Sequence, residues 1–191
     1  MNVDCAFGNS RHRLADRKDD LYETPACAVE ALLRVEHLPC GIWEPACGRG
    51  AIASVLIARG HKVCSSDLVA YGKGYAGVDF LMETKMPVGT EAIVTNPPFK
   101  LGHEFVRHAL TLCPKVYTLH RLAFYESERR SDILDTGYLR RIYCFRKRLP
   151  MMHRDGWAGP RASSSVAFAW FVWDRANPGP TQLRRISWEG A

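Results

Sequence analysis

The chain alternates between short apolar stretches and longer stretches whose apolar residues recur every three or four positions. The first pattern is typical of buried β-strands, and the second is typical of α-helices with one buried side. Strands are predicted at residues 41–43, 62–66, 77–80, 91–95, 115–120, 138–146 and 165–173. Helices are predicted from a start at Thr24-Pro25 and at residues 51–59, 101–112 and 126–135.

This alternation predicts an α/β fold with a largely parallel sheet and helices on both faces. At the first helix, Thr24 is the expected N-cap and Pro25 the expected first helical residue. The strands at 138–146 and 165–173 lack a helix-sized connector between them. They are therefore expected to form an antiparallel hairpin at the edge of the sheet.

Length and composition fit one globular domain at residues 21–191, preceded by an arm at residues 1–20 that is expected to be flexible. The chain has 191 residues, of which 47% are hydrophobic and 24% charged. No apolar run approaches the ~20 residues that span a bilayer, and the polar N-terminus does not resemble a signal peptide. Seven cysteines without paired metal-ligand spacing predict reduced thiols, a cytoplasmic location and no metal site.

The net charge of +6 is concentrated in the last third of the chain. Residues 1–120 carry 13 basic and 13 acidic side chains, whereas residues 121–191 carry 13 basic and 7 acidic ones. Twelve of the latter basic residues are arginine, which suits bidentate phosphate contacts. This excess indicates either a solvated basic face or a surface that binds a polyanion.

Candidate functional residues follow the ends of the predicted strands, where open parallel sheets bind ligands. The four candidate site segments are residues 44–50 (EPACGRG), Asp67, Asp79-Phe80 and residues 96–99 (NPPF). Gly48 and Gly50 allow a tight turn, and Asp67 is placed to accept hydrogen bonds from ribose hydroxyls. The run from Gly48 to Ala53 also matches the G-x-G-x-x-A form of nicotinamide dehydrogenases, but a dehydrogenase would not explain NPPF.

EPACGRG followed by NPPF resembles motifs I and IV of S-adenosylmethionine-dependent amino-methyltransferases, and most closely those of the bacterial and phage N6-adenine DNA methyltransferases. Residues 20–25 (DLYETP) resemble motif X of that family, and residues 166–174 (VAFAWFVWD) resemble its closing strand. The resemblance covers roughly residues 20–175, and it implies a class I, Rossmann-like fold. The chain has no room for a separate target-recognition domain, which predicts little or short sequence specificity. NPPF also resembles motifs of RNA adenine methyltransferases, and the variant NPPY marks protein glutamine methyltransferases.

The resemblance implies S-adenosyl-L-methionine as cofactor and the N6 amine of adenine in DNA as acceptor. The implied cofactor-binding residues are Tyr22, Thr24, Pro25, Glu44, Pro45, Ala46, Cys47, Gly48, Gly50, Asp67, Leu68, Asp79, Phe80 and Asn96. The implied catalytic residues are Asn96, Pro97, Pro98 and Phe99. Asn96 and the Pro97 carbonyl would accept hydrogen bonds from the amine, and Phe99 would stack on the base.

A base inside a duplex must be flipped out before it can reach such a pocket. The loop at residues 151–161 mixes cationic, aromatic and glycine residues that suit this step, although an ordinary hairpin loop would also explain it. The expected nucleic-acid contacts are Lys100, Arg121, His153, Arg154, Trp157 and Arg161, whereas His120 is expected to be structural or to contact phosphate. The alternative of another class is a catalytically silent nucleic-acid-binding protein of the same fold. The sequence does not indicate an oligomeric state.

Overall fold

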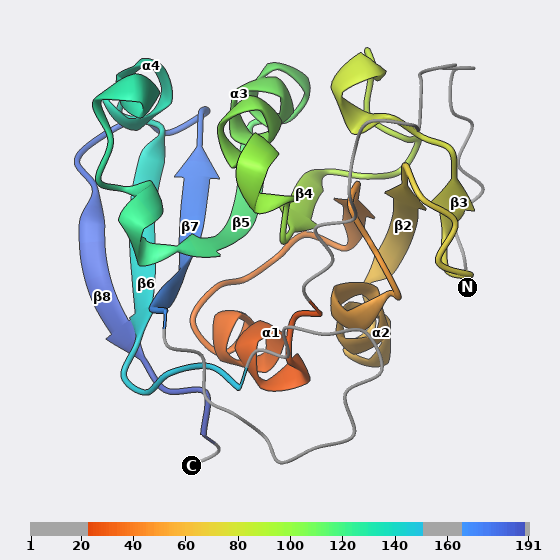
Figure 1. Ribbon diagram of the computed structural model, residues 1–191, viewed down its shortest axis with the longest axis horizontal. Coiled ribbons are helices and arrows are strands. Elements are labelled where there is room, and N and C mark those ends of the chain that lie inside the picture. The colour runs from red at the N-terminus through yellow and green to blue at the C-terminus, as the bar shows by residue number, and fades with distance from the viewer. Residues whose placement is uncertain (1–22, 151–165, 190–191) are drawn as a thin grey trace.

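The computed structural model describes residues 23–150 and 166–189. Eight strands form one sheet in the order β3-β2-β1-β4-β5-β7-β6-β8 (Figure 1). The strands are β1 (Gly41–Glu44), β2 (Lys62–Asp67), β3 (Tyr75–Ala76), β4 (Ala92–Thr95), β5 (Lys115–Arg121), β6 (Leu139–Phe145), β7 (Phe168–Asp174) and β8 (Gln182–Ile186). The four α-helices are α1 (Ala26–Leu33), α2 (Ala51–Ala58), α3 (Gly102–Leu112) and α4 (Ser131–Leu134).

The sheet is parallel from β3 to β5, and β7 alone runs against its neighbours. β6 and β7 form the predicted antiparallel pair, but β7 lies inside, against β5. β8 pairs in parallel with β6 and occupies the edge, so the expectation of a hairpin at the edge is wrong in this respect. The predicted α/β class and largely parallel sheet are confirmed.

Each face of the sheet has its own hydrophobic core, because successive strand residues point to opposite faces. Ile42 and Val94 pack with α1 and α2 on one face, which lies at the bottom of Figure 1. Trp43 and Ile93 pack with α3 and Ile133 of α4 on the other face. Burial on both faces is why the central strands are apolar throughout.

Three predicted elements differ from those observed. No strand forms at residues 77–80: β3 ends at Ala76, and residues 80–82 form a 3₁₀ turn that Asp79 caps by accepting a hydrogen bond from the Leu81 N–H. Helix α1 begins at Ala26 with Pro25, and not Thr24, at the N-cap, where the Pro25 carbonyl accepts from the Ala28 N–H at 2.9 Å. The predicted helix at 126–135 is a 3₁₀ turn at Glu128–Arg130 followed by the short α4.

Candidate active site at the carboxyl edge of the sheet

One edge of the sheet is formed by the carboxyl ends of the parallel strands β1, β2, β4 and β5. The candidate site segments predicted from the sequence lie at this edge. β1 pairs with β2 on one side and with β4 on the other, so the chain order reverses between β1 and β4. In an open α/β sheet this reversal leaves a crevice beyond the strand ends. The turn after β1 and the Asn96 turn after β4 therefore follow the ends of neighbouring parallel strands, at the same edge of the sheet.

Asp67, at the end of β2, holds the glycine-containing turn after β1. Its Oδ2 accepts a hydrogen bond from the Gly48 N–H at 2.8 Å, and its Oδ1 accepts one from the Val69 N–H at 2.9 Å. The backbone of Gly48 has φ 51° and that of Gly50 has φ 78°, in the left-handed region that favours glycine. The carboxylate and the two glycines thus fix one tight turn at the expected cofactor edge.

Glu44 is the last residue of β1, and its side chain is 1% exposed. Its Oε2 accepts a hydrogen bond from the Ala53 N–H at 2.9 Å, one of the donors that the first turn of α2 leaves without a helical partner. Burial raises the pKa of the Glu44 carboxyl well above its usual range, the Ala53 N–H opposes that shift, and nearby Asp67 adds to it. Glu44 therefore ties strand β1 to the start of α2.

Cys47 lies in the same turn and stays a thiol. Burial, Glu44 and Asp67 together raise the pKa of its thiol to about 12. Its Sγ donates to the Lys73 carbonyl at 3.5 Å. The thiolate is the nucleophilic form of cysteine, so this residue does not serve as a nucleophile near neutral pH. The neighbouring Pro45 is buried and Ala46 is half-buried, so both support the turn through backbone and packing.

The segment that resembles motif X reaches the turn after β1. The Glu23 carboxylate lies 3.9 Å from the Arg49 guanidinium, and the Thr24 side chain is buried beside α1. Thr24 and Pro25 follow Glu23 directly in the chain, and their implied role in cofactor binding stays a prediction. Tyr22 lies outside the described residues.

Asp79 and Phe80 follow β3 on the same side of the crevice. The Phe80 ring is 2% exposed and packs edge-on against Trp43, with 5.2 Å between ring centroids, and against Phe105 at 4.8 Å. Because the Phe80 ring is buried in this way, it anchors the loop after β3 to the hydrophobic core. The implied role of Phe80 in cofactor binding stays a prediction. Leu68 is half-buried in the loop after β2.

The Asn96-Pro97-Pro98-Phe99 turn leaves β4 and leads directly into α3. Thr95 and Pro97 are buried, Asn96 and Phe99 are half-buried, and the Pro98 carbonyl accepts from the Leu101 N–H at 2.9 Å. The two prolines fix their own φ angles and give no N–H to the sheet, so the strand stops here and the turn is stiff. Phe99 packs against Phe168 of β7, with 5.8 Å between ring centroids.

Arg121, the last residue of β5, places its guanidinium carbon 4.5 Å from the centroid of the Phe99 ring. This cation–π contact joins a predicted phosphate-binding residue to the predicted base-stacking residue. Lys100 is exposed beside them. His153, Arg154, Trp157 and Arg161, the other expected nucleic-acid contacts, lie outside the described residues.

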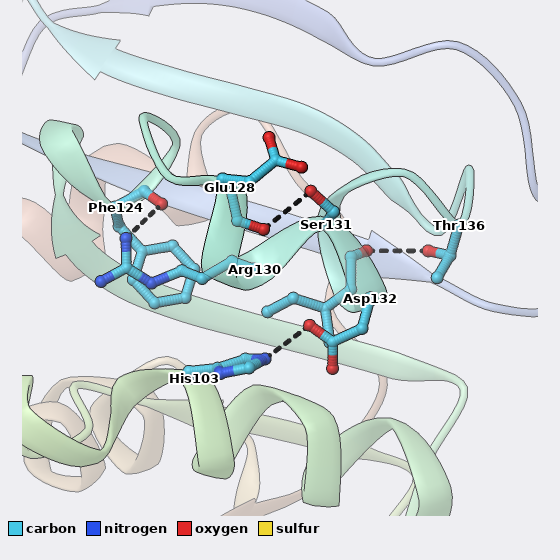
Figure 2. Close-up of polar contacts among 8 residues, drawn as sticks. His103, Phe124, Glu128, Arg130, Ser131, Asp132 and Thr136 are labelled. Atoms are coloured by element: carbon cyan, nitrogen blue, oxygen red, sulfur yellow. Dashed lines mark hydrogen bonds and ion pairs between the residues drawn. The ribbon is translucent and has the colours of Figure 1, made fainter.

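The segment after Arg121 packs beside α3 and contacts it through Asp132 of α4 (Figure 2). His103 Nε2 and Asp132 Oδ1 lie 2.7 Å apart, and the Arg130 guanidinium donates to the Phe124 carbonyl at 3.0 Å. The His120 ring is 1% exposed and stacks on Phe124 at 3.8 Å. Burial, and secondarily the charge of Arg130, lower the pKa of His120 to about 3, so it is neutral and structural at neutral pH.

Two parts of the site were missed by sequence reasoning. The Lys73 side chain lies over Gly50, where an added Cβ would meet it at 3.5 Å. The only local signal for this contact in the sequence was the pair of glycines on either side of Lys73, Gly72 and Gly74. The aromatic residues Phe168 and Trp188 border a pocket at the same edge, and Trp188 contacts Lys147, which lies 41 positions earlier in the chain, so no local pattern predicts that contact.

Within the described residues, no group of three or more potential ligands could hold a metal ion. The part of the chain covered by the structure contains no helix both long and apolar enough to cross a membrane. Five described cysteines, Cys27, Cys40, Cys47, Cys113 and Cys144, are free thiols.

No protein-family model and no curated protein matches this sequence, so the comparison rests on structure. A modification subunit assigned to a type I restriction enzyme of Vibrio vulnificus is 13% identical with a TM-score of 0.58, over 90% of this chain and 48% of that one. A Pyrococcus horikoshii protein assigned as an RNA methyltransferase is 14% identical with a TM-score of 0.57, over 83% and 90%. A Listeria monocytogenes protein assigned as a class I S-adenosylmethionine-dependent methyltransferase is 12% identical with a TM-score of 0.55, over 84% and 62%.

These likenesses show the fold. The chain has the class I methyltransferase fold, as its sequence motifs imply. It spans about half the length of the restriction-enzyme subunit that it matches, and most of the length of the Pyrococcus protein.

Proposed function

We propose that the chain binds S-adenosylmethionine and transfers its methyl group to the N6 amine of adenine in DNA. The observation that carries this proposal is the position of the Asn96-Pro97-Pro98-Phe99 turn. It follows β4, the strand paired with β1, and so shares the crevice with the glycine-containing turn that Asp67 holds. This arrangement supports a cofactor site and an acceptor site that lie side by side.

The residues beyond β1 and β2 suit the cofactor. Asp67 accepts backbone N–H groups through both carboxylate oxygens at the end of β2, and a carboxylate in this position would also accept a hydrogen bond from a ribose hydroxyl. Asp79 uses Oδ1 for the Leu81 N–H at 3.2 Å and would offer Oδ2 to the adenine amino group. When bound, the cofactor supplies an electrophilic methyl group on a sulfonium. Glu44 and Cys47 would act by shaping the turn, and Thr24 and Pro25 by closing its outer side.

The acceptor turn suits an exocyclic amine, which is a weak nucleophile because its lone pair is delocalised into the ring. The Asn96 side-chain oxygen and the Pro97 carbonyl would accept the two amine hydrogens and draw the nitrogen toward tetrahedral geometry. This localises the lone pair and aims it at the methyl group, so the turn acts by orientation and electrostatics. The stiffness that the prolines give to the turn is what such positioning requires.

Phe99 would offer one ring face to the target base, and Arg121, already stacked on that ring, would hold a neighbouring phosphate. Two features of the sequence favour DNA as the acceptor. The motif is NPPF and not NPPY, and the last third of the chain is basic. With many cations and few base-reading groups, the chain should bind tightly and discriminate weakly between sequences. Its binding should also fall steeply with salt.

RNA adenine is the second candidate acceptor. It is favoured by the coverage of the structural match, which includes 90% of the Pyrococcus protein but only 48% of the restriction-enzyme subunit. Protein glutamine and a catalytically silent binding protein are the remaining alternatives.

The deciding experiment incubates the chain with methyl-labelled S-adenosylmethionine and separate pools of DNA, RNA and protein. We expect label in DNA. Label confined to RNA or to protein would replace the acceptor assignment, and no label in any pool, despite cofactor binding, would support the silent alternative.

A further inference from the structure

A second pocket lies at the same edge of the sheet, beyond the end of β6 and the start of β7. It measures about 670 Å³, within the range of roughly 300–1,000 Å³ that is common for small-ligand sites. Its aromatic lining residues are Phe145, Phe168 and Trp188, and its basic ones are Arg146, Lys147 and Arg148. None of the described lining residues is acidic.

The pocket adjoins the proposed acceptor turn. Phe168 contributes to its lining and contacts Phe99, with 5.8 Å between the ring centroids. Phe168 also pairs with Arg121, the residue stacked on Phe99. One aromatic residue thus separates the pocket from the ring on which the target base would stack.

The wall formed by the residues after β8 is held in place by three contacts. The Trp188 indole N–H donates to the Lys147 carbonyl at 3.0 Å, and Arg34 donates to the Ser187 carbonyl at 2.7 Å. Lys147 Nζ pairs with the Glu189 carboxylate at 2.8 Å. The Trp188 ring is therefore positioned before any ligand arrives, which reduces the ordering cost of stacking on it.

Two of the three cations among the described lining residues are available to an anion. Lys147 is engaged by Glu189, whereas Arg146 and Arg148 are exposed and form no ion pair with a carboxylate of the described chain. Two guanidinium groups beside an aromatic wall match the chemistry of a nucleotide, with its phosphate and its flat base. No amide or carboxylate among the described lining residues is placed to read a base edge.

We propose that this pocket binds the nucleotide next to the reacting adenine in a single strand, or in a strand splayed out of a duplex. Arg146 and Arg148 contact its phosphate, and its base stacks on the aromatic wall that includes Trp188. The subsite accepts any base, because stacking and phosphate contacts carry no sequence information. This proposal rests on the proposed function, in that the acceptor is a nucleic acid.

The test uses a fluorescent oligothymidylate, which has no adenine, and measures binding by anisotropy without cofactor. The pocket variant is R146Q/R148Q. The matched control is R184Q/R185Q, which removes the same charge from exposed positions of β8 outside the pocket lining. We expect the pocket variant to bind at least about tenfold more weakly, with a salt slope smaller by about 0.7 for each phosphate that the variant no longer neutralises. The control should change binding by less than about threefold.

Stacking is tested separately by W188A and W188F. Alanine should weaken binding by about fivefold to 150-fold and phenylalanine much less, because stacking needs a ring face. Thermal unfolding of each variant shows whether the fold is intact. Equal losses of affinity in the pocket and control variants, or tight binding by W188A, would overturn the subsite. Because the probe cannot be methylated at adenine, that outcome leaves methyl transfer to be judged by the labelled-cofactor experiment.

Discussion

Replacing Asp67 with asparagine separates the two roles that the structure and the proposed function give to this side chain. The carboxylate accepts the Gly48 N–H and the Val69 N–H through different oxygens. Asparagine keeps one of these acceptors and turns the other position into a donor that faces an N–H. Losing one hydrogen bond to a charged group should lower the free energy of unfolding by about 1.5–3 kcal/mol. For a chain of this length, that is a shift of roughly 2–4 °C in Tm per kcal/mol.

The same change should weaken S-adenosylmethionine binding, because the negatively charged acceptor for the ribose is removed. A hydrogen bond of about 1.5–3 kcal/mol corresponds to a rise in Kd of about 10- to 150-fold. Titration calorimetry at a temperature well below the Tm measures this effect on folded protein, and denaturant unfolding measures the stability.

Asp174→Asn is the matched control. Asp174 accepts the Ala176 N–H at 3.1 Å and the Asn177 side-chain amide at 2.9 Å, but β7 is antiparallel and ends at the opposite edge of the sheet. This variant should lose stability and keep its cofactor affinity. If Asp67→Asn binds the cofactor like the wild type, or Asp174→Asn loses affinity equally, the assignment of Asp67 to the ribose is wrong.

Three further predictions address the acceptor turn and the frame around it. Asn96→Ala should lower methyl transfer at least about a hundredfold while cofactor affinity in calorimetry stays nearly unchanged, and a joint loss would make Asn96 structural. Glu36→Ala should cost about 2 kcal/mol or more in urea unfolding, because it leaves Arg141 and the Tyr143 hydroxyl without their shared carboxylate; a change below about 0.5 kcal/mol would contradict this. His120 stays neutral in the fold down to a pKa of about 3 but takes up a proton near pH 6.5 when unfolded, so stability falls as pH drops through that window. His120→Gln should remove roughly 2 kcal/mol of the loss between pH 7 and pH 5, and an unchanged pH slope would refute the assignment.

The local patterns predicted most of the sheet, because buried central strands are apolar on both faces and end at glycine, proline or aspartate. The turn after β4 is the clearest case, since the two prolines stop the strand and place Asn96 beyond it. β8 was missed because its first four residues are exposed and its partner β6 lies about 40 residues earlier in the chain. An exposed edge strand leaves little hydrophobic signal.

The candidate site was predictable at positions where the backbone conformation or a backbone hydrogen bond requires one particular type of residue. Gly48, Gly50 and Asp67 are of this kind, because the turn needs positive φ angles and the N–H groups need an acceptor. The position of Phe80 was not predictable in this way, because its alternation with Val78 suggested a strand. In the structure Asp79 caps a 3₁₀ turn, and the Phe80 ring packs in the hydrophobic core. Packing against residues distant in sequence decided its orientation.

The most direct test of the central claim is mass spectrometry of nucleosides from DNA that has been incubated with the chain and S-adenosylmethionine. We predict N6-methyl-deoxyadenosine with the wild-type chain and none above background with Asn96→Ala. Methyl groups on cytosine, or unmodified DNA from a wild-type chain that methylates only RNA or protein, would contradict the assignment of adenine in DNA.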